Sequence, residues 1–328
     1  MDPETSSVAG RALDSAWLSF ALRRGARFVL SLWVLVTAAF LMIHLVPGDP
    51  VRAALGMDAP ADLVVARREA LGLDDPLLTQ YWLYIRNLFA GDLGTSLGSG
   101  EPVSTLVLDR LGATIQLAVL AFVSAVVVAI PAGVAVAVAT RAGRRRGTEL
   151  VFAASSVLAA AIPEFLLAVG LVYVFAVKLA WVPVAGAGTV SSYVLPVLAL
   201  AVGPAAILVR IIRVEMLAVL EDDFIRTARA KRLTARRIYL CHALPNALTA
   251  TLTLGGLMLT TMVVGTVLVE NVFAWPGLGA RIVQSITSKD YPVVQAIVLV
   301  YGTLVLLVNL LVDVALALLD PRSSIREA

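Results

Sequence analysis

Apolar residues dominate six stretches of this 328-residue chain, and each is long enough to cross a bilayer as a helix. At about 1.5 Å per residue, a helix of about 20 residues spans the hydrocarbon core of a membrane. The apolar positions run on continuously instead of alternating, which favours helices over the strands of a membrane barrel. The predicted spans are residues 28–46, 113–139, 150–177, 193–214, 246–269 and 293–319.

The spans divide the chain into a simple order. Residues 1–27 form a polar N-terminal segment, residues 47–112 a long region after the first span, residues 113–319 a core of five further spans, and residues 320–328 a tail. The pattern predicts an all-α integral membrane protein that forms one structural unit. Prolines inside the spans are tolerated because neighbouring helices can satisfy the freed carbonyls; they are Pro131, Pro163, Pro196 and Pro204.

The region 47–112 is too long to be a simple connection. Helix-like pieces alternate in it with Gly and Pro, and acids outnumber bases. We expect a compact helical cap on the second span that offers aromatic and acidic surface to a partner. His44 and Asp49, at the end of the first span, are interpreted as interface residues, with a role in a transport pathway as the alternative.

Composition and charge support this prediction. The chain is 59% hydrophobic and 15% charged, whereas soluble domains carry about 25% charged residues. Most of the 26 Lys and Arg fall on the side of the membrane that would hold both termini. Because cytoplasmic loops are enriched in Lys and Arg, both termini of this multi-pass protein are predicted to be cytoplasmic.

Several kinds of chemistry are not supported by the sequence. It contains no GxxxxGK[ST] phosphate loop, no GxSxG or HExxH motif and no paired catalytic carboxylates. The single Cys241 and the distant His44 and His242 do not form a metal or redox motif. Ionisable residues are sparse inside the spans, whereas ion-coupled pumps carry relays of them. We therefore expect no catalysis, and energy supplied by a partner if a solute moves uphill.

A basic stretch, DDFIRTARAKRLTARRIYLCHALPNAL at residues 222–248, interrupts the apolar pattern after the fourth span. Its pattern predicts a helix that begins with Asp222 and Asp223, where acids complement the helix dipole. A turn and a second helix capped by Thr234 would follow, with Pro245 separating that helix from the fifth span. Such a segment suits docking on another protein; the alternative is that its cations only set the orientation of the chain.

The same stretch resembles the cytoplasmic coupling motif of ABC importer permeases, which reads EAA, a Gly four residues on and, after nine residues, I-x-L-P. In this register Arg226, Thr227 and Ala228 stand at EAA, Arg232 at Gly, His242 at Ile, and Leu244 and Pro245 at LP. Further motifs similar to the dipeptide and oligopeptide permeases of the B type follow in order along nearly the whole chain. They are IHLVPGDP, GDLGTSL, VFAWPGLG, DYPVVQ, NLLVD and LLDPR.

The resemblance implies a type I importer permease fold in the bacterial plasma (inner) membrane, and a set of partners. A second homologous permease would form the channel with this chain, and two cytoplasmic P-loop ATPases would bind ATP and Mg. An extracytoplasmic binding protein would deliver the peptide. This chain would bind no cofactor, metal or nucleic acid. Its coupling segment, residues 222–245, would place a short helix in a cleft of one ATPase through Asp222, Asp223, Phe224, Ile225, Arg226, Thr227, Ala228, Ala230, Lys231, Arg232, Leu233, Leu244 and Pro245.

One residue departs from the family pattern. Arg232 stands where the family usually has Gly, which commonly ends a helix in the left-handed conformation. Arg232 would then carry strain of about 1–2 kcal/mol, or the turn would be reshaped. Small Ala228 and Ala230 are expected to allow close docking on the ATPase.

Candidates for a translocation pathway or gate lie elsewhere. Glu164, in the third span, is a buried acid beside a proline and thus a functional candidate; a packing role is the alternative. The outer turn, ENVFAWPGLGARI at residues 270–282, is expected to fold back as part of a gate, with membrane-interface anchoring as the alternative. Asp313 is expected to make a local polar contact, and Gly255, Gly256 and Gly265 to serve helix packing. The gate residues are Glu270, Asn271, Phe273, Trp275, Pro276 and Gly277.

The predicted function is import of dipeptides or oligopeptides as half of a heterodimeric, ATP-driven channel. Within the same class, a nickel chelate, glutathione, haem or an oligosaccharide is an alternative substrate. A proton-coupled transporter using Glu164 and Asp313, or a scaffold without transport activity, belongs to other classes. A scaffold gives no reason for a docking helix together with a large external region.

Overall fold

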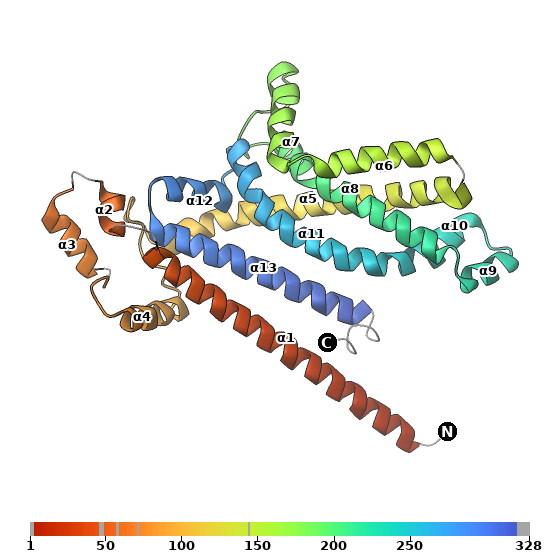
Figure 1. The fold of residues 1–328 in the computed structure, drawn as a ribbon, viewed down its shortest axis with the longest axis horizontal. Helices are drawn as coiled ribbons and strands as arrows, with labels where there is room; N and C mark the ends of the chain where they lie inside the picture. Colours follow the sequence, from red (N-terminus) through yellow and green to blue (C-terminus); the bar gives the residue numbers. More distant parts are fainter. Residues whose placement is uncertain (1–2, 46–48, 57–58, 71, 144, 320–328) are drawn as a thin grey trace.

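The computed structural model describes residues 3–45, 49–56, 59–70, 72–143 and 145–319, and these form a helical bundle (Figure 1). The long helices are α1 (Pro3–Leu45), α5 (Val103–Thr140), α8 (Val194–Val219), α11 (Leu244–Val272) and α13 (Tyr291–Leu319). The shorter ones are α2 (Pro50–Leu55), α3 (Ala61–Ala70), α4 (Leu77–Phe89), α6 (Arg146–Ala161), α7 (Glu164–Leu171), α9 (Asp223–Ala230), α10 (Ala235–Arg237) and α12 (Leu278–Thr287). Two π-helical segments, Val172–Lys178 and Ile238–Ala243, extend α7 and join α10 to α11.

Five helices in the described chain are long and apolar enough to cross a membrane, or six spans if one bent pair counts as one. The all-α membrane fold is therefore confirmed. The third predicted span, residues 150–177, is not one straight helix, because α6 and α7 are bent by 95° at their junction. Ile162 is extended there (φ −73°, ψ 120°), as expected for a residue before proline. As a result α7 projects away from the bundle (Figure 1).

The first helix is longer than predicted. The sequence analysis starts the first span at residue 28, but α1 is helical from Pro3, and its apolar part begins at Leu18. The sequence contains no proline between Pro3 and Leu45 that would end the helix. A large part of the predicted N-terminal segment is therefore continuous with the span.

The most extensive helix packing in the described chain joins α5 to α8. Small residues recur every fourth position on α5, at Ala121, Ala125, Ala129, Gly133 and Ala137, and all are buried. A Cβ added to Gly133 would lie 2.6 Å from the Ile212 side chain of α8. Such a small-residue face allows two helix backbones to approach closely, as in membrane helix pairs in general.

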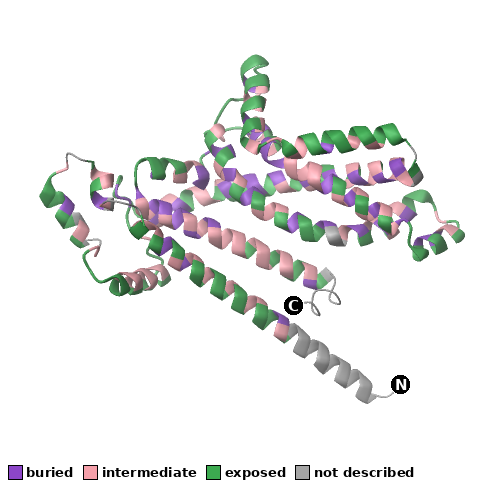
Figure 2. Ribbon diagram, viewed as in Figure 1, coloured by how far each residue is buried: buried purple, intermediate pink, exposed green. Residues whose placement is uncertain are grey.

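The long helices α11, α13 and α1 pack beside the pair of α5 and α8. α11 packs on α8 and α13, and α1 packs on α13. Gly256 of α11 lies directly against Val312 of α13, so the predicted packing role of that glycine is confirmed. Figure 2 shows exposed residues along α1 and α6, and buried ones concentrated on α5, α8 and the start of α13.

The sequence analysis predicted that the helices of the region 47–112 cap the second span, and this was wrong. They lie beside the end of α1 (Figure 1), where α4 contacts Thr37 and His44 through side chains. A cavity of about 390 Å³ beside these contacts is lined by residues of α4, the end of α1 and the start of α13. Aromatic side chains on α4 fit the face of α1 around Phe40, and this complementarity is not visible in either segment alone.

Candidate functional site

The coupling segment lies at one end of the bundle, and α12 and the helices α2–α4 lie toward the other (Figure 1). Its first helix, α9, follows α8 after a tight turn in which the Leu220 amide donates to the Met216 carbonyl. The predicted helix, turn and second helix are all present.

The two faces of α9 differ sharply. Ile225 is completely buried and Ala228 nearly so, within a cluster that includes Met216 of α8 and Leu220, the residue that follows α8. Phe224, the neighbour of Ile225, leaves 44% of its surface exposed, and Thr227 is also exposed. The helix therefore uses one face to fix itself to its own chain and presents the other to its surroundings.

Ala228 thus belongs to the inner face and not to the surface available for a partner. Of the other residues expected to couple, Leu233 and Leu244 are half-buried against the same cluster. The exposed members are Asp222, Asp223, Phe224, Arg226, Thr227, Ala230, Lys231, Arg232 and Pro245.

Polar contacts anchor α9 at its base. Arg229 donates from Nη2 to the Leu220 carbonyl at 3.0 Å and so satisfies a carbonyl at the end of α8. Thr227 donates to the Asp223 carbonyl. The ion pair of Arg226 with Asp223 is almost fully exposed, and such pairs stabilise little. The attachment of α9 therefore depends on Ile225, Ala228 and Arg229.

Arg232 adopts the left-handed conformation, with φ +56°. Its amide donates to the Arg229 carbonyl, and the Leu233 amide donates to the Ala228 carbonyl. These two bonds define a Schellman motif, in which the residue at this position is usually Gly. Of the two outcomes considered from the sequence, the turn keeps its shape and Arg232 carries the strain.

We expect Arg232→Gly to stabilise the subunit by about 1 kcal/mol, because glycine adopts φ > 0 without a steric cost. The thermal unfolding midpoint of the purified chain should rise. Arg232→Ala is the matched control, since it removes the same charged side chain but keeps Cβ. An equal rise in both variants would attribute the effect to the charge and contradict strain at this turn.

Pro245 does not separate the second helix from the fifth span, contrary to prediction. The chain runs from α10 through the π-helical segment Ile238–Ala243 directly into α11. Pro245 lies in the first turn of α11, directly after the π-helical segment, and the helical run continues through it. Thr234 has the backbone conformation of a cap, but its hydroxyl makes no cap bond.

The turn at residues 270–282 folds back on the end of α11, and the carboxyl group of Glu270 organises it. Glu270 is completely buried. It accepts hydrogen bonds from the Thr114 hydroxyl at 2.7 Å and from the amides of Gly279 (2.6 Å) and Ala280 (3.2 Å). Those two amides lie in the first turn of α12, where a negative charge complements the helix dipole. Through these hydrogen bonds the carboxyl group of Glu270 holds the start of α12.

Two glycines make this approach possible. A Cβ on Gly277 would lie 2.3 Å from a Glu270 oxygen, and one on Gly279 would lie 2.4 Å from the Val267 backbone. Thr114 of α5 completes the arrangement, because its hydroxyl donates to Glu270 and accepts from the Leu278 amide at 2.8 Å. Helices α5, α11 and α12 are thus joined through one buried acid.

The aromatic residues of the turn at residues 270–282 are inside the protein. Phe273 and Trp275 are buried, which argues against the alternative of membrane-interface anchors. Trp275 donates from its indole to the Ala113 carbonyl at 3.2 Å and packs edge-on against Tyr193. Asn271 is exposed and donates to the Val267 and Gly279 carbonyls. Pro276 is exposed at the tip of the turn.

Glu164 and Asp313 have separate surroundings. Glu164 begins α7 at the bend, and its side chain lies against Gly265 of α11. Its Oε2 is buried without a hydrogen-bond partner among the described residues. Asp313 forms an ion pair with Arg24 of α1 at 2.7 Å, so the predicted local polar contact is confirmed. No relay joins the two acids within the described part of the chain.

The sequence analysis did not predict a buried polar contact made by Asp290. Asp290 is buried and accepts from the Ser96 hydroxyl and from the Leu97 amide at 3.0 Å. It links the GDLGTSL and DYPVVQ motifs, which stand almost 200 residues apart. Ser96 and Asp290 lie inside quoted motifs, which was the available signal for them, whereas Thr114 lies in none. The sequence did not indicate the partners of any of the three.

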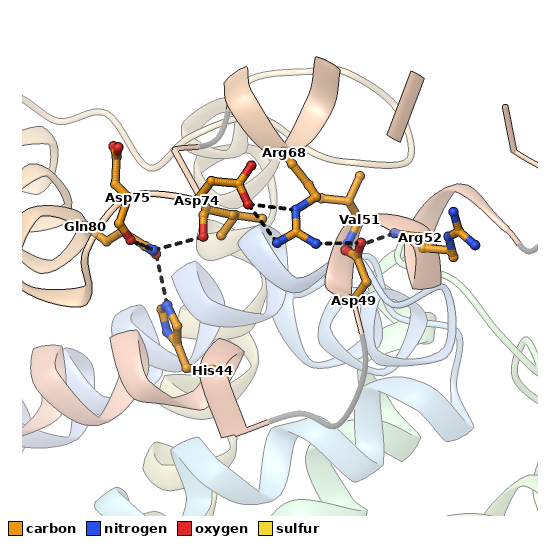
Figure 3. Close-up of polar contacts among 9 residues, drawn as sticks. His44, Asp49, Val51, Arg52, Arg68, Asp74, Asp75 and Gln80 are labelled. Carbon is orange, nitrogen blue, oxygen red and sulfur yellow. Dashed lines mark hydrogen bonds and ion pairs between the residues drawn. The ribbon is translucent and has the colours of Figure 1, made fainter. Parts of the chain in front are cut away.

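The end of the first span carries a polar network (Figure 3). Arg68 forms ion pairs with Asp49 (3.1 Å) and Asp74 (2.8 Å). Asp49 also caps α2 by accepting from the Val51 and Arg52 amides. His44 and Asp49 thus serve the local structure here.

Gln80 connects this network to α1. The Nε2 of His44 lies 3.0 Å from Oε1 of Gln80, whose amide donates to the carbonyls of Leu73 and Asp75 (Figure 3). The connection between α3 and α4 is therefore tied to the end of the first span.

Asp49 should make this region sensitive to acid. Burial alone would raise the pKa of Asp49, but two backbone amides and the Arg68 guanidinium hold it below its ordinary value. The stabilisation is then present at neutral pH and is lost as the pH falls below about 4. We expect amide hydrogen exchange in α2 to increase in that range.

Asp49→Ala should show the faster exchange already at neutral pH, with a loss of about 1 kcal/mol typical of a removed helix cap. Asp62→Ala, at an exposed acid on α3, is the control. Acid-induced exchange in α2 that persists unchanged in Asp49→Ala would contradict this role.

The described residues contain no cluster of His, Cys, Asp and Glu that could hold a metal ion. The described residues thus form a helical membrane protein with a short helix, α9, that exposes one face at one end of the bundle, and with a turn organised by the buried Glu270 toward the other. Comparison with known proteins identifies the family.

Residues 129–325 match the family model of the binding-protein-dependent transport system inner membrane component, and residues 17–118 match the model of its N-terminal part. The chain belongs to this family. Glutathione transport system permease proteins GsiC of Escherichia coli O6:H1 and Salmonella typhi are 37% identical to it over 304 residues. Each match covers 93% of this chain and 98% of the relative.

The fold agrees with this assignment. An inward-facing structure of the MetNI methionine ABC transporter matches with a TM-score of 0.54 at 20% identity, covering 66% of this chain and 96% of that chain. The protein is thus an inner-membrane permease subunit of an ABC importer with the type I fold. Subunits of this kind work with a partner permease, with ATPases that hydrolyse ATP, and with a binding protein.

Proposed function

We propose that this chain imports short peptides and couples to its ATPases through residues 222–245. The observation that carries the proposal is the division of α9 into a buried face and an exposed face. Phe224 and Thr227 would meet an ATPase, while Ile225 and Ala228 hold the helix to the bundle. Asp222, Asp223 and the exposed cations after α9 would add charged contacts around this patch.

A docked helix can transmit motion only if it is firmly attached to the spans. Ile225 and Ala228 share one buried cluster with Met216 of α8 and Ala247 of α11. A movement of α9 would therefore shift two spans together. In this proposal two P-loop ATPases bind the ATP and Mg, this chain binds no cofactor, and both of its termini lie in the cytoplasm.

The second, homologous permease would pack on the side of α8 that carries Arg210. Arg210 is exposed although it lies within an apolar span. With Glu215 and Leu254 it lines a groove between α8 and α11 of about 350 Å³. Charged residues within a membrane face a partner or a water-filled path and not lipid, so this groove is the proposed edge of the channel.

The substrate would be a short peptide. Relatives that are 37% identical over most of the chain are glutathione permeases, and glutathione is itself a modified tripeptide. A dipeptide and glutathione share one chemistry, since each is a short amide chain with a free amino group and at least one carboxylate. Glutathione is the first compound to compare with an ordinary dipeptide.

Uptake in cells that express this chain with its partner subunits tests the proposal. We expect accumulation of labelled dialanine or glutathione that stops when the P-loop lysine of the ATPases is replaced. Excess unlabelled peptide should compete with the label. Uptake that continues with inactive ATPases, or accumulation of neither compound while another solute of the class is taken up, would contradict it.

A further inference from the structure

The helix α4 exposes a continuous apolar stripe. Leu78, Trp82 and Phe89 leave 83%, 68% and 89% of their surfaces exposed. Together with the half-buried Ile85 they follow a spacing of four, three and four residues, so they occupy one helix face. A stripe this aromatic on the surface of a protein marks contact with a partner or with a membrane.

The opposite face of α4 is tied to the first span. The Tyr81 hydroxyl lies 2.7 Å from the Thr37 hydroxyl. The rings of Tyr81 and Tyr84 lie 5.1 Å and 5.6 Å from that of Phe40. Gln80 adds its contact with His44 (Figure 3). The orientation of α4 is therefore set by α1.

These contacts also give the depth of α4. The apolar part of α1 ends at Leu45, and at about 1.5 Å per residue Phe40 lies about 8 Å and Thr37 about 12 Å before that end. The residues that hold α4 therefore belong to the last turns of a membrane span. Amphipathic helices that bind membrane surfaces lie about 5–10 Å into the boundary between headgroups and acyl chains.

The apolar surface of α1 continues towards α4. Leu41 and Leu45 follow Phe40 and His44 directly in sequence and are exposed, so they lie on the adjacent face of the same helix end. Polar residues flank the stripe of α4. Asp74 and Asp75 are exposed before the helix, and Arg86 is exposed on its edge.

We propose that α4 lies in the lipid interface at this end of α1, with Leu78, Trp82 and Phe89 inserted among the acyl chains and headgroups. The flanking acids remain in water, and the Arg86 side chain reaches the headgroups. The helix anchors the end of the first span in the plane of the membrane. This inference does not depend on the peptide substrate or on the ATPase contact.

Lipid contact can be measured with a fluorophore. The only cysteine, Cys241, is replaced by Ser, and a polarity-sensitive NBD label is attached at Leu78→Cys, Trp82→Cys or Phe89→Cys. Thr79→Cys, at an exposed position away from the stripe on the same helix, is the control. The subunit is reconstituted with the subunits that co-purify with it in phosphatidylcholine nanodiscs, with or without lipids that carry nitroxides near the headgroup.

We expect lipid nitroxides to quench the labels at Leu78, Trp82 and Phe89 about threefold more strongly than the label at Thr79, because only direct lipid contact brings the two probes together. Emission at the three positions should also shift to the blue. Equal quenching at all four positions overturns the proposal. So does protection of the three labels that appears only when a loaded binding protein is added, since the stripe would then be a protein-docking surface.

Discussion

Phe224→Ala is expected to weaken the association of this subunit with its ATPases about tenfold or more while leaving the membrane part folded. Phe224 is the large apolar side chain that α9 exposes, and exposed aromatic residues on a docking surface commonly contribute 1–2 kcal/mol or more to binding. The measurement is the amount of ATPase that co-purifies with the subunit, together with transport in vesicles. Both should fall, and the thermal midpoint of the isolated subunit should not change.

Ile225→Ala is the matched control, because it alters the next residue on the opposite face of the same helix. Ile225 is completely buried among α8 and π-helical residues of its own chain. Its truncation should cost about 2–5 kcal/mol of stability and lower the thermal midpoint. If Phe224→Ala retains normal ATPase binding and transport, the exposed face of α9 is not the docking surface.

Glu270→Ala is expected to have the largest effect on the fold, a loss of about 3 kcal/mol or more. The substitution leaves the Gly279 and Ala280 amides and the Thr114 hydroxyl without their buried acceptor, and each unsatisfied buried donor costs about 1–3 kcal/mol. Amide exchange in α12 should become much faster, and the yield of folded subunit should fall. Transport should be lost along with the closed turn.

Two further variants test whether the effect comes from the hydrogen bonds of Glu270 or from loss of any side chain nearby. Thr114→Val keeps the shape but removes the hydroxyl bridge to Glu270 and Leu278, and we expect a smaller loss in the same α12 amides. Leu268→Ala truncates an exposed side chain of α11 about half a turn away and should change little. Normal exchange in α12 of Glu270→Ala would show that the helix start does not depend on this acid.

The apolar pattern predicted the membrane spans well because a span must be long and apolar whatever it packs against. The apolar pattern did not predict where a span bends. The pattern places Pro163 inside one continuous span, like Pro131 and Pro204, which do lie inside helices. At Pro163 the chain instead bends by 95°. Hydropathy does not distinguish these cases, because a bend depends on whether neighbouring helices hold the two halves in line.

The sequence predicted more of the coupling segment than of the turn around Glu270. The register of the coupling segment correctly raised a left-handed turn at Arg232, because the conformation that ends a helix is a local property. The sequence could not assign the faces of α9, so Ala228 was expected to face a partner although it packs on its own chain. Likewise Glu270 was selected as an acid unsuited to lipid, without Thr114 as its partner.

The sequence by itself determined the membrane class, the number of apolar segments and the place of the coupling segment. These follow from interactions with the solvent and within one helical turn, which act on neighbouring residues. Only the tertiary structure decided that Glu270 holds the start of α12, that Asp290 joins two distant motifs, and that α4 rests on the first span. Each of these contacts pairs side chains from different helices, and their free energy depends on a distance that only the packed bundle sets.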